Sequence, residues 1–175
     1  MSEFIDRIKI IKGDITKQTG IDAIVCGIYP DMTLEGSLNA SVMAAAGAQL
    51  DEFILANIYK PRIGDAFATP PFSLPVWHII FTVVPRWRDG FFHEDVQLLR
   101  GFRAAMALAQ RMQLKSVAFP ALGSGRKKFP VSRAARIALQ GIADRESGQF
   151  DEIRVVCNRD DVYEAFVDRL KSLAP

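Results

Sequence analysis

Residues able to bind an anion gather in one loop of this 175-residue chain, at positions 121–130. Its glycines allow backbone N–H groups to turn toward an anion, and a serine hydroxyl and basic side chains add further donors. The composition predicts a phosphate-binding loop, although the spacing is neither that of a P-loop nor that of the dinucleotide motif. A tight turn without a ligand is the alternative. The residues concerned are Gly123, Ser124, Gly125, Arg126, Lys127 and Lys128.

Two further loops, at residues 13–16 and 29–38, each follow an apolar run. The first contains Asp14, whose carboxylate would accept N–H groups of a ligand well. Alternatively, Asp14 caps a short helix that begins near Ile15. The two cysteines, Cys26 and Cys157, lack the spacing of a metal or redox motif, so we expect free buried thiols, with a disulfide or a catalytic thiol as alternatives. We expect no metal and no cofactor.

The elements that must position these loops alternate between strand and helix. Continuous apolar runs such as residues 22–28 are typical of strands buried on both faces of a sheet. The alternation predicts the α/β class: a three-layer α/β/α fold with a mixed central sheet of about six strands and helices on both faces. Ligands of such folds bind at the carboxyl ends of the strands.

The expected strands cover residues 7–12, 22–28, a short segment within 64–75, 77–84, 115–120 and 152–157. The expected helices cover residues 15–18, 38–59 with a break at Gly47, 94–113, 131–145 and 161–173. In the helix over 94–113, helical spacing predicts an apolar face made of Val96, Leu99, Phe102, Ala105, Met106 and Ala109.

The composition and length of the chain indicate which class of protein it belongs to. Hydrophobic residues make up 49% of the chain and charged residues 24%, as in a globular protein, and the length predicts a single domain over residues 1–175. The net charge of +2 is too small to indicate nucleic-acid or membrane binding. No apolar run approaches the roughly 18 residues of a spanning helix, and the first residues do not look like a secretory signal. We therefore expect a cytoplasmic protein.

Short motifs along almost the whole chain resemble those of the macro domain family, whose members bind ADP-ribose and related nucleotides. Each motif is weak on its own, but their number and order make the resemblance specific. They are Gly-Asp-Ile-Thr at 13–16, Asp-Ala-Ile-Val at 22–25, Ala-Ala-Ala-Gly at 44–47, Gly-Asp-Ala at 64–66, Leu-Pro at 74–75, Thr-Val-Val-Pro at 82–85, Ala-Phe-Pro-Ala at 118–121, Gly-Ser-Gly at 123–125 and Phe-Pro at 129–130.

The resemblance implies a role for each matching residue. Asp14 would accept the exocyclic amine of adenine, with the Ile15 backbone beside it, and Asn158 would flank the adenine ring. The loop with Gly123, Ser124, Gly125, Arg126 and Lys127 would wrap the diphosphate and distal ribose. Residues Gly36, Ser37 and Leu38 stand where the family has its first, glycine-rich phosphate loop.

This chain departs from the family where hydrolysis would take place. The family typically has Asn-Ala-Ala-Asn after the second strand, and its second asparagine supports hydrolysis, whereas this chain has residues 26–29, ending in Tyr29. The aspartate that ends the family's glycine run is replaced by Asn39, whose amide cannot act as a general base. Tyr29 could also fill the distal ribose pocket.

Three functions are therefore open, and the catalytic residues, if any, are unknown. The first is a binding module for ADP-ribose or a related adenine nucleotide without efficient hydrolysis, with ADP-ribosylated protein as a further partner. The second is a hydrolase of ADP-ribosyl or phosphate esters. The third is a scaffold for protein or single-stranded RNA. Candidate residues for the hydrolase are Tyr29, Cys26, His78 and His93, and those for the scaffold are Trp87, Phe91 and Phe92.

Overall fold

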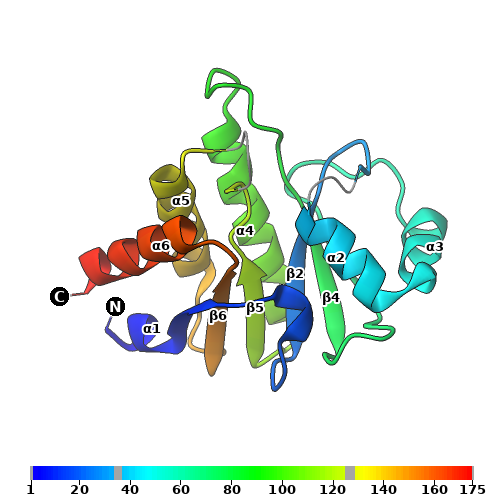
Figure 1. The fold of residues 1–175 in the computed structure, drawn as a ribbon, viewed down its shortest axis with the longest axis horizontal. Helices are drawn as coiled ribbons and strands as arrows, with labels where there is room; N and C mark the ends of the chain where they lie inside the picture. The colour runs from blue at the N-terminus through cyan, green and yellow to red at the C-terminus, as the bar shows by residue number, and fades with distance from the viewer. Residues whose placement is uncertain (1, 34–36, 125–128, 175) are drawn as a thin grey trace.

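The computed structural model describes residues 2–33, 37–124 and 129–174, and within them a six-stranded mixed sheet forms the centre of the molecule (Figure 1). Its strand order is β1-β6-β5-β2-β4-β3, and every neighbouring pair is parallel except β3 with β4. The strands are β1 (Ile8–Lys12), β2 (Ala23–Ile28), β3 (Ala66–Thr69), β4 (His78–Val83), β5 (Ser116–Pro120) and β6 (Glu152–Cys157).

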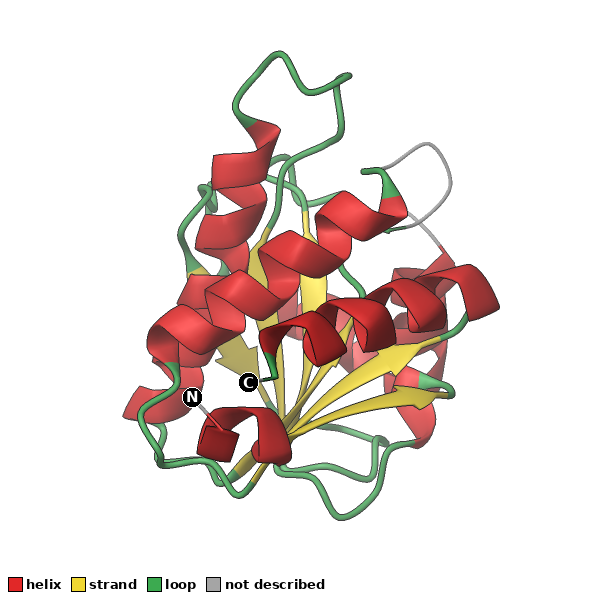
Figure 2. Cartoon of the chain, turned by 90° about the vertical axis from the view of Figure 1, so that its left-hand side faces the viewer, coloured by secondary structure: helices red, strands yellow, loops and turns green. Residues whose placement is uncertain are grey.

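Helices cover both faces of this sheet, as the alternation predicted. The 3-10 helix η1 with α2 and α3 covers one face, and α4, α5 and α6 cover the other, with α5 and α6 side by side in Figure 2. The short helix α1 leads into β1. The helices are α1 (Ser2–Arg7), η1 (Ile15–Lys17), α2 (Ser37–Ala46), α3 (Ala48–Asn57), α4 (Glu94–Arg111), α5 (Val131–Arg145) and α6 (Asp160–Leu173).

Each face of the sheet has its own apolar core, because successive side chains of a strand point to opposite faces. In β2, for example, Val25 packs with α4 and α5, whereas Ile24 and Cys26 pack with α2 and α3. All six residues of β2 are buried. This explains why the strand reads as a continuous apolar run with no polar alternation.

The expected three-layer α/β/α fold is confirmed, and most expected elements are present within one or two residues. The break at Gly47 is real: this residue has a φ of +98°, which glycine adopts without strain, and it separates α2 from α3. The predicted apolar face of α4 was partly wrong. Val96 is 51% exposed, and Leu98 is fully buried instead. The opening helix α1 was not expected.

None of the helices described is long and apolar enough to cross a membrane.

The ladder between β2 and β5 is much shorter than its neighbours. Within the described strands it pairs only Ala23 with Val117 and Ile24 with Ala118, whereas β2 pairs with β4 along all six of its residues. The strands β2 and β5 therefore pair at their amino ends and separate toward their carboxyl ends. This separation lies at the edge of the sheet where the sequence predicts the site.

Candidate functional site

The carboxyl ends of five parallel strands bring the predicted site residues to one edge of the sheet. Following the strand order along this edge, Asp14 lies after β1, Asn158 after β6, residues 121–124 after β5, and Tyr29 after β2. The loop over residues 84–93 follows β4. Residues from distant parts of the sequence are thus arranged in a row.

The centre of this row is where the sheet connections diverge. The chain leaves β2 toward α2 and α3 on one face, and leaves β5 toward α5 on the other. In open α/β sheets a crevice forms between two such strands and takes the ligand. Leu122 packs at this point against Gly27, where an added Cβ would lie 3.0 Å from Leu122 Cδ2 and 3.1 Å from Val84 Cγ2. Gly27 thus allows the loop after β5 to approach β2 closely.

Asp14 stands exposed at the β1 end of the edge. Its Oδ1 accepts hydrogen bonds from the Thr16 backbone N–H at 2.8 Å and from the Thr16 hydroxyl at 2.6 Å. These bonds lower the pKa of Asp14 and make it the cap of η1. Its Oδ2 accepts no hydrogen bond from the described residues. The same carboxylate can therefore cap η1 through one oxygen and receive a donor from a ligand through the other.

The two predicted neighbours of Asp14 differ in exposure. The side chain of Ile15 is buried in the core on the η1 face, so only its backbone could meet a ligand. Asn158 is exposed and follows Cys157, whose carbonyl accepts the Gly13 N–H at 3.0 Å. The turns after β1 and β6 are thus tied together, which brings Asn158 and Asp14 to the same end of the edge.

In the loop after β5, Gly123 and Ser124 form a closed turn. Gly123 has a φ of +84°, and its carbonyl accepts the Phe129 N–H at 2.8 Å. The hydroxyl of Ser124 is buried and donates to the carbonyl of Ala121, so it serves the turn itself. Among the other predicted phosphate-binding residues, Gly125, Arg126, Lys127 and Gly36 lie outside the described residues. Ser37, Leu38 and Asn39 begin α2, but their side chains are not part of the description.

Arg159 is a residue of this edge that sequence reasoning missed. Its Nη1 donates to the Ser124 carbonyl at 3.0 Å, while its Nε and Nη2 bind both carboxylate oxygens of Asp161. Arg159 therefore ties the turn after β5 to the start of α6. The only signal for it in the sequence is an arginine directly before two aspartates at the start of a helix.

Tyr29 closes the other half of the edge. Its side chain is only 4% exposed, and the guanidinium of Arg86 stacks on its ring at 3.9 Å. Arg86 also pairs with Asp31 at 2.8 Å. Hydrogen bonds from Thr33, together with Arg86, lower the pKa of Asp31 to about 2. The turn from Tyr29 to Thr33 is therefore fastened to the loop after β4.

Glu94 organises that loop and was also missed from the sequence. Its carboxylate is buried at the start of α4 and accepts the backbone N–H groups of Arg88, Gly90 and Phe92 at 2.5–3.0 Å. Burial by itself raises the pKa of Glu94, but these hydrogen bonds outweigh it and lower the pKa overall. The signal in the sequence is an acid in the first turn of a predicted helix, just after a turn with Asp89 and Gly90.

Of the four residues considered for nucleophilic or acid–base chemistry, Tyr29 and His93 belong to loops at this edge, whereas Cys26 and His78 do not. Cys26 is fully buried, and desolvation raises the pKa of its thiol to about 12, so a thiolate does not form near neutral pH. His78 begins β4 and thus lies at the opposite edge of the sheet. His93 is exposed in the loop before α4. Cys26 and Cys157 are both free, as expected. The described residues contain no group of three or more metal-ligating side chains.

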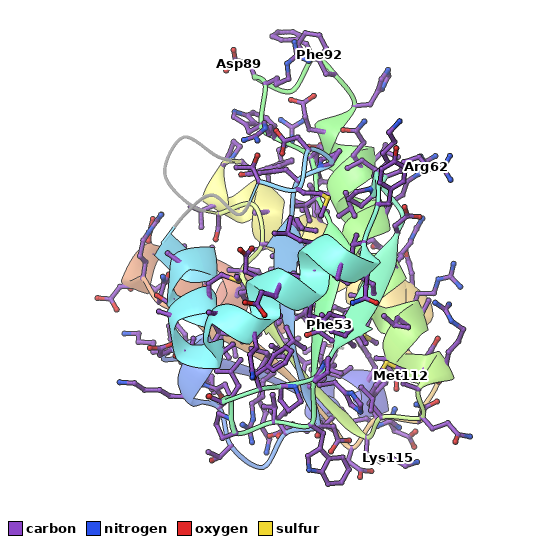
Figure 3. All side chains as sticks on the ribbon, turned by 90° about the vertical axis from the view of Figure 1, so that its right-hand side faces the viewer. Phe53, Arg62, Asp89, Phe92, Met112 and Lys115 are labelled. Atoms are coloured by element: carbon purple, nitrogen blue, oxygen red, sulfur yellow. The ribbon has the colours of Figure 1, made fainter. Side chains whose placement is uncertain are left out.

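The three aromatic residues of the scaffold hypothesis have different environments. Trp87 packs against Phe129, with ring centroids 4.7 Å apart, and therefore belongs to the packed loop. Phe91 and Phe92 are 85% and 50% exposed near the tip of the loop, where Arg88 lies over the Phe92 ring at 4.0 Å. Figure 3 shows this tip, marked by Asp89 and Phe92, projecting from the molecule.

Comparison with known proteins shows which family this chain resembles. The family model described as Macro domain matches residues 30–138. A macro domain-containing protein of Lactiplantibacillus plantarum is 34% identical over 170 residues, which cover 95% of this chain and 97% of that protein. O-acetyl-ADP-ribose deacetylase 1 of Pantoea vagans is 32% identical over 173 residues, covering 94% and 98%.

Solved structures of macrodomains have the same fold as this chain. A mutant macrodomain of Oceanobacillus iheyensis with ADPR superposes with a TM-score of 0.85 and 28% identity, over 95% of this chain and 92% of the other. The same protein with ADP gives a TM-score of 0.83 and 29% identity, over 97% and 93%.

Proposed function

Because the chain belongs to the macro domain family, we propose that it is a binding module for ADP-ribose or a related adenine nucleotide, without efficient hydrolysis of ADP-ribosyl groups. The observation that carries the proposal is Asp14: an exposed carboxylate at the carboxyl edge, with one oxygen fixed by Thr16 and the other turned to no described donor. A low pKa keeps it ionised and ready to accept the exocyclic amine of adenine.

The row of loops along the edge supports an extended ligand. With adenine at Asp14, the diphosphate would pass the turn of Gly123 and Ser124 at the crevice between β5 and β2, and the distal ribose would point toward Tyr29. The relatives with ADPR or ADP bound support this class of ligand. The burial of Tyr29 beneath Arg86 supports a site without the amide that other family members use for hydrolysis.

Titration calorimetry with AMP, ADP and ADP-ribose tests the proposal. We expect AMP and ADP to bind, and we expect the distal ribose of ADP-ribose to improve the affinity by no more than about threefold. No heat with any of the three nucleotides would contradict nucleotide binding and favour the scaffold with exposed Phe91 and Phe92.

Two variants separate the two roles of Asp14. Asp14→Ala should weaken AMP binding by about 1.5 to 3 kcal/mol, the range for a hydrogen bond to a charged group, and should also lower the melting temperature. Asp14→Asn retains an oxygen for the cap but places an amide N–H₂ in place of the second oxygen. We expect it to lose affinity while melting near the wild-type temperature. Unchanged affinity per folded molecule in both variants would contradict the adenine assignment.

The second candidate is a hydrolase of an O-acetyl or phosphate ester of ADP-ribose. It is favoured by the name of the Pantoea vagans relative, O-acetyl-ADP-ribose deacetylase 1. Three of the four candidate residues speak against it, since Cys26 and Tyr29 are buried and His78 lies at the far edge. The fourth, His93, is exposed in the loop after β4. Incubation of the protein with O-acetyl-ADP-ribose, followed by chromatography of the products, distinguishes the two functions.

A further inference from the structure

A groove with arginine side chains lies between α5 and α6, away from the carboxyl edge of the sheet. It has a volume of about 460 Å³ and lies on the helical face that Figure 2 turns toward the viewer. A smaller hollow of about 190 Å³ adjoins it on the side of α4 and shares Arg136 and Arg169 with it. The residues lining the main groove are Ser132, Arg133, Arg136, Ala165, Asp168 and Arg169.

The arginines of this groove have more donors than the protein satisfies. The Nε of Arg169 is buried without a hydrogen-bond partner, and within the described residues its guanidinium makes no ion pair. Arg136 reaches only one oxygen of Asp95, at 3.8 Å, because Arg133 already holds both oxygens of that carboxylate at 2.8 Å. The charges of Arg136 and Arg169 are therefore only partly balanced within the described residues, so an anion in the groove would pair with both guanidinium groups.

The side chains that line the groove favour a phosphate group as the bound anion. A guanidinium offers donors in a planar fork that matches the oxygens of a phosphate group. Three guanidinium groups line the groove, and two of them, those of Arg136 and Arg169, are not held by a close ion pair among the described residues. Ser132 lies in the first turn of α5, where the helix dipole also favours negative charge. Asp168 would repel a second anionic group but accept the hydroxyl of a ligand.

The volume is that of a small-molecule site, since such sites measure about 300 to 1,000 Å³ and a lone oxyanion needs much less. We propose that the groove binds a small phosphorylated molecule with hydroxyl groups, of the sugar phosphate class. Arg136 and Arg169 hold its phosphate, and Asp168 and Ser132 receive its hydroxyl groups. The site shares no residue with the proposed nucleotide site and does not depend on it.

A titration of the full chain with ribose 5-phosphate, followed by backbone amide NMR, tests the proposal. We expect saturable shifts in α5 and α6 around residues 132–136 and 165–169, also in the Asp14→Ala variant. Ribose should give no shifts, and inorganic phosphate should bind more weakly than ribose 5-phosphate. The double variant Arg136→Gln with Arg169→Gln should weaken binding at least about tenfold.

The matched control is the pair Arg111→Gln with Arg145→Gln, which removes the same charge from exposed positions outside the groove and should bind normally. Three results would overturn the proposal: no shifts in α5 and α6 at millimolar ribose 5-phosphate, equal binding by the double variant and its control, or loss of the shifts in Asp14→Ala. Tighter binding of a tetraglutamate peptide than of ribose 5-phosphate would instead identify an acidic protein segment as the occupant and would also overturn it.

Discussion

The two ends of the carboxyl edge differ in how far the protein's own contacts occupy them. At the β1 end, Asp14 and Asn158 are exposed, and Asp14 uses one oxygen internally. At the β4 end, Tyr29 is buried beneath Arg86, Arg86 is paired with Asp31, and Glu94 ties the next loop together. Both ends use the same device, a carboxylate that accepts backbone N–H groups.

The two carboxylates differ in how many hydrogen bonds they can still accept from a ligand. Asp14 accepts one backbone N–H and keeps an oxygen toward solvent, whereas Glu94 accepts three and is buried. A ligand at the β1 end therefore finds a fixed acceptor without displacing anything. A ligand at the β4 end would have to displace stacked and paired side chains. The comparison teaches that one edge of a sheet can combine an open end with an end closed by the protein's own contacts.

The largest expected effect comes from reopening the closed end. Wild-type protein should release little ADP-ribose from an auto-modified acceptor, because the family resemblance implies that Tyr29 and Asn39 stand in place of the groups that position and activate water. The double variant Tyr29→Asn with Asn39→Asp should raise release by at least about 100-fold, since general base catalysis and positioning each contribute on that scale. Release of labelled ADP-ribose over time measures it.

The control for this experiment is Tyr29→Asn with Asn39 unchanged, which opens the end without supplying a base. Removing a buried tyrosine also creates a cavity, so circular dichroism must show that each variant is folded at the assay temperature. Rapid release by the wild type, abolished by changing Gly123 and Ser124, would refute the idea of a closed end.

A smaller effect is expected from Glu94→Gln. The substitution places an amide N–H₂ where the carboxylate accepts backbone N–H groups, so the loop over residues 84–93 should loosen. We expect the melting temperature to fall by about 5 °C or more, measured by calorimetry. Glu52→Gln, the same change on an exposed face of α3, should leave it unchanged. Equal melting of both variants would mean that Glu94 does not hold the closed end.

The smallest effect concerns the pH dependence of the Asp31–Arg86 pair. The pKa of Asp31 is about 2 in the folded protein and about 4 when unfolded, so its stabilisation is complete above pH 4 and is lost toward pH 2. Asp31→Asn should therefore melt about 1 to 3 °C below the wild type at pH 7, as expected for an exposed pair, and the difference should shrink below pH 4.

The control for this pair is Asp6→Asn on α1, at an exposed aspartate without an ion pair among the described residues. It should melt like the wild type at every pH. A melting difference for Asp31→Asn that persists unchanged at pH 2 would show that the carboxylate charge does not contribute, and that Arg86 is held by its stacking on Tyr29.

Most of the fold could be predicted from the sequence because its signals are local. The apolar run of β2 and the helical spacing in α4 each arise within a few residues, and Gly47 marks its own helix break. The predicted apolar face of α4 was partly wrong because Val96 and Leu98 are both apolar residues. Only contact with α5 and the sheet decides which of the two is buried. Helix α1 was missed because its pattern is too short to stand out.

The site was harder to predict because its contacts connect distant loops. The sequence identified Asp14 and the glycine loop by type and order, but the bond from Arg159 to Ser124 spans two strands of the sheet. Likewise, the sequence shows that Glu94 is an acid at the start of a predicted helix, but it does not show that its carboxylate accepts three backbone N–H groups of the preceding loop. Side chains that bind the backbone of other segments become visible only when the fold brings those segments together.

The short ladder between β2 and β5 has a consequence for the cooperativity of the molecule. Because only two residue pairs join β2 and β5 in the part of the chain that the structure describes, the sheet divides into a unit of β1, β6 and β5 and a unit of β2, β4 and β3, connected mainly near Ala23 and Val117. Partial unfolding follows such weak seams. In native-state hydrogen exchange we therefore expect two foldons, with the proposed nucleotide site at their boundary, and a ligand that spans both should slow their independent opening.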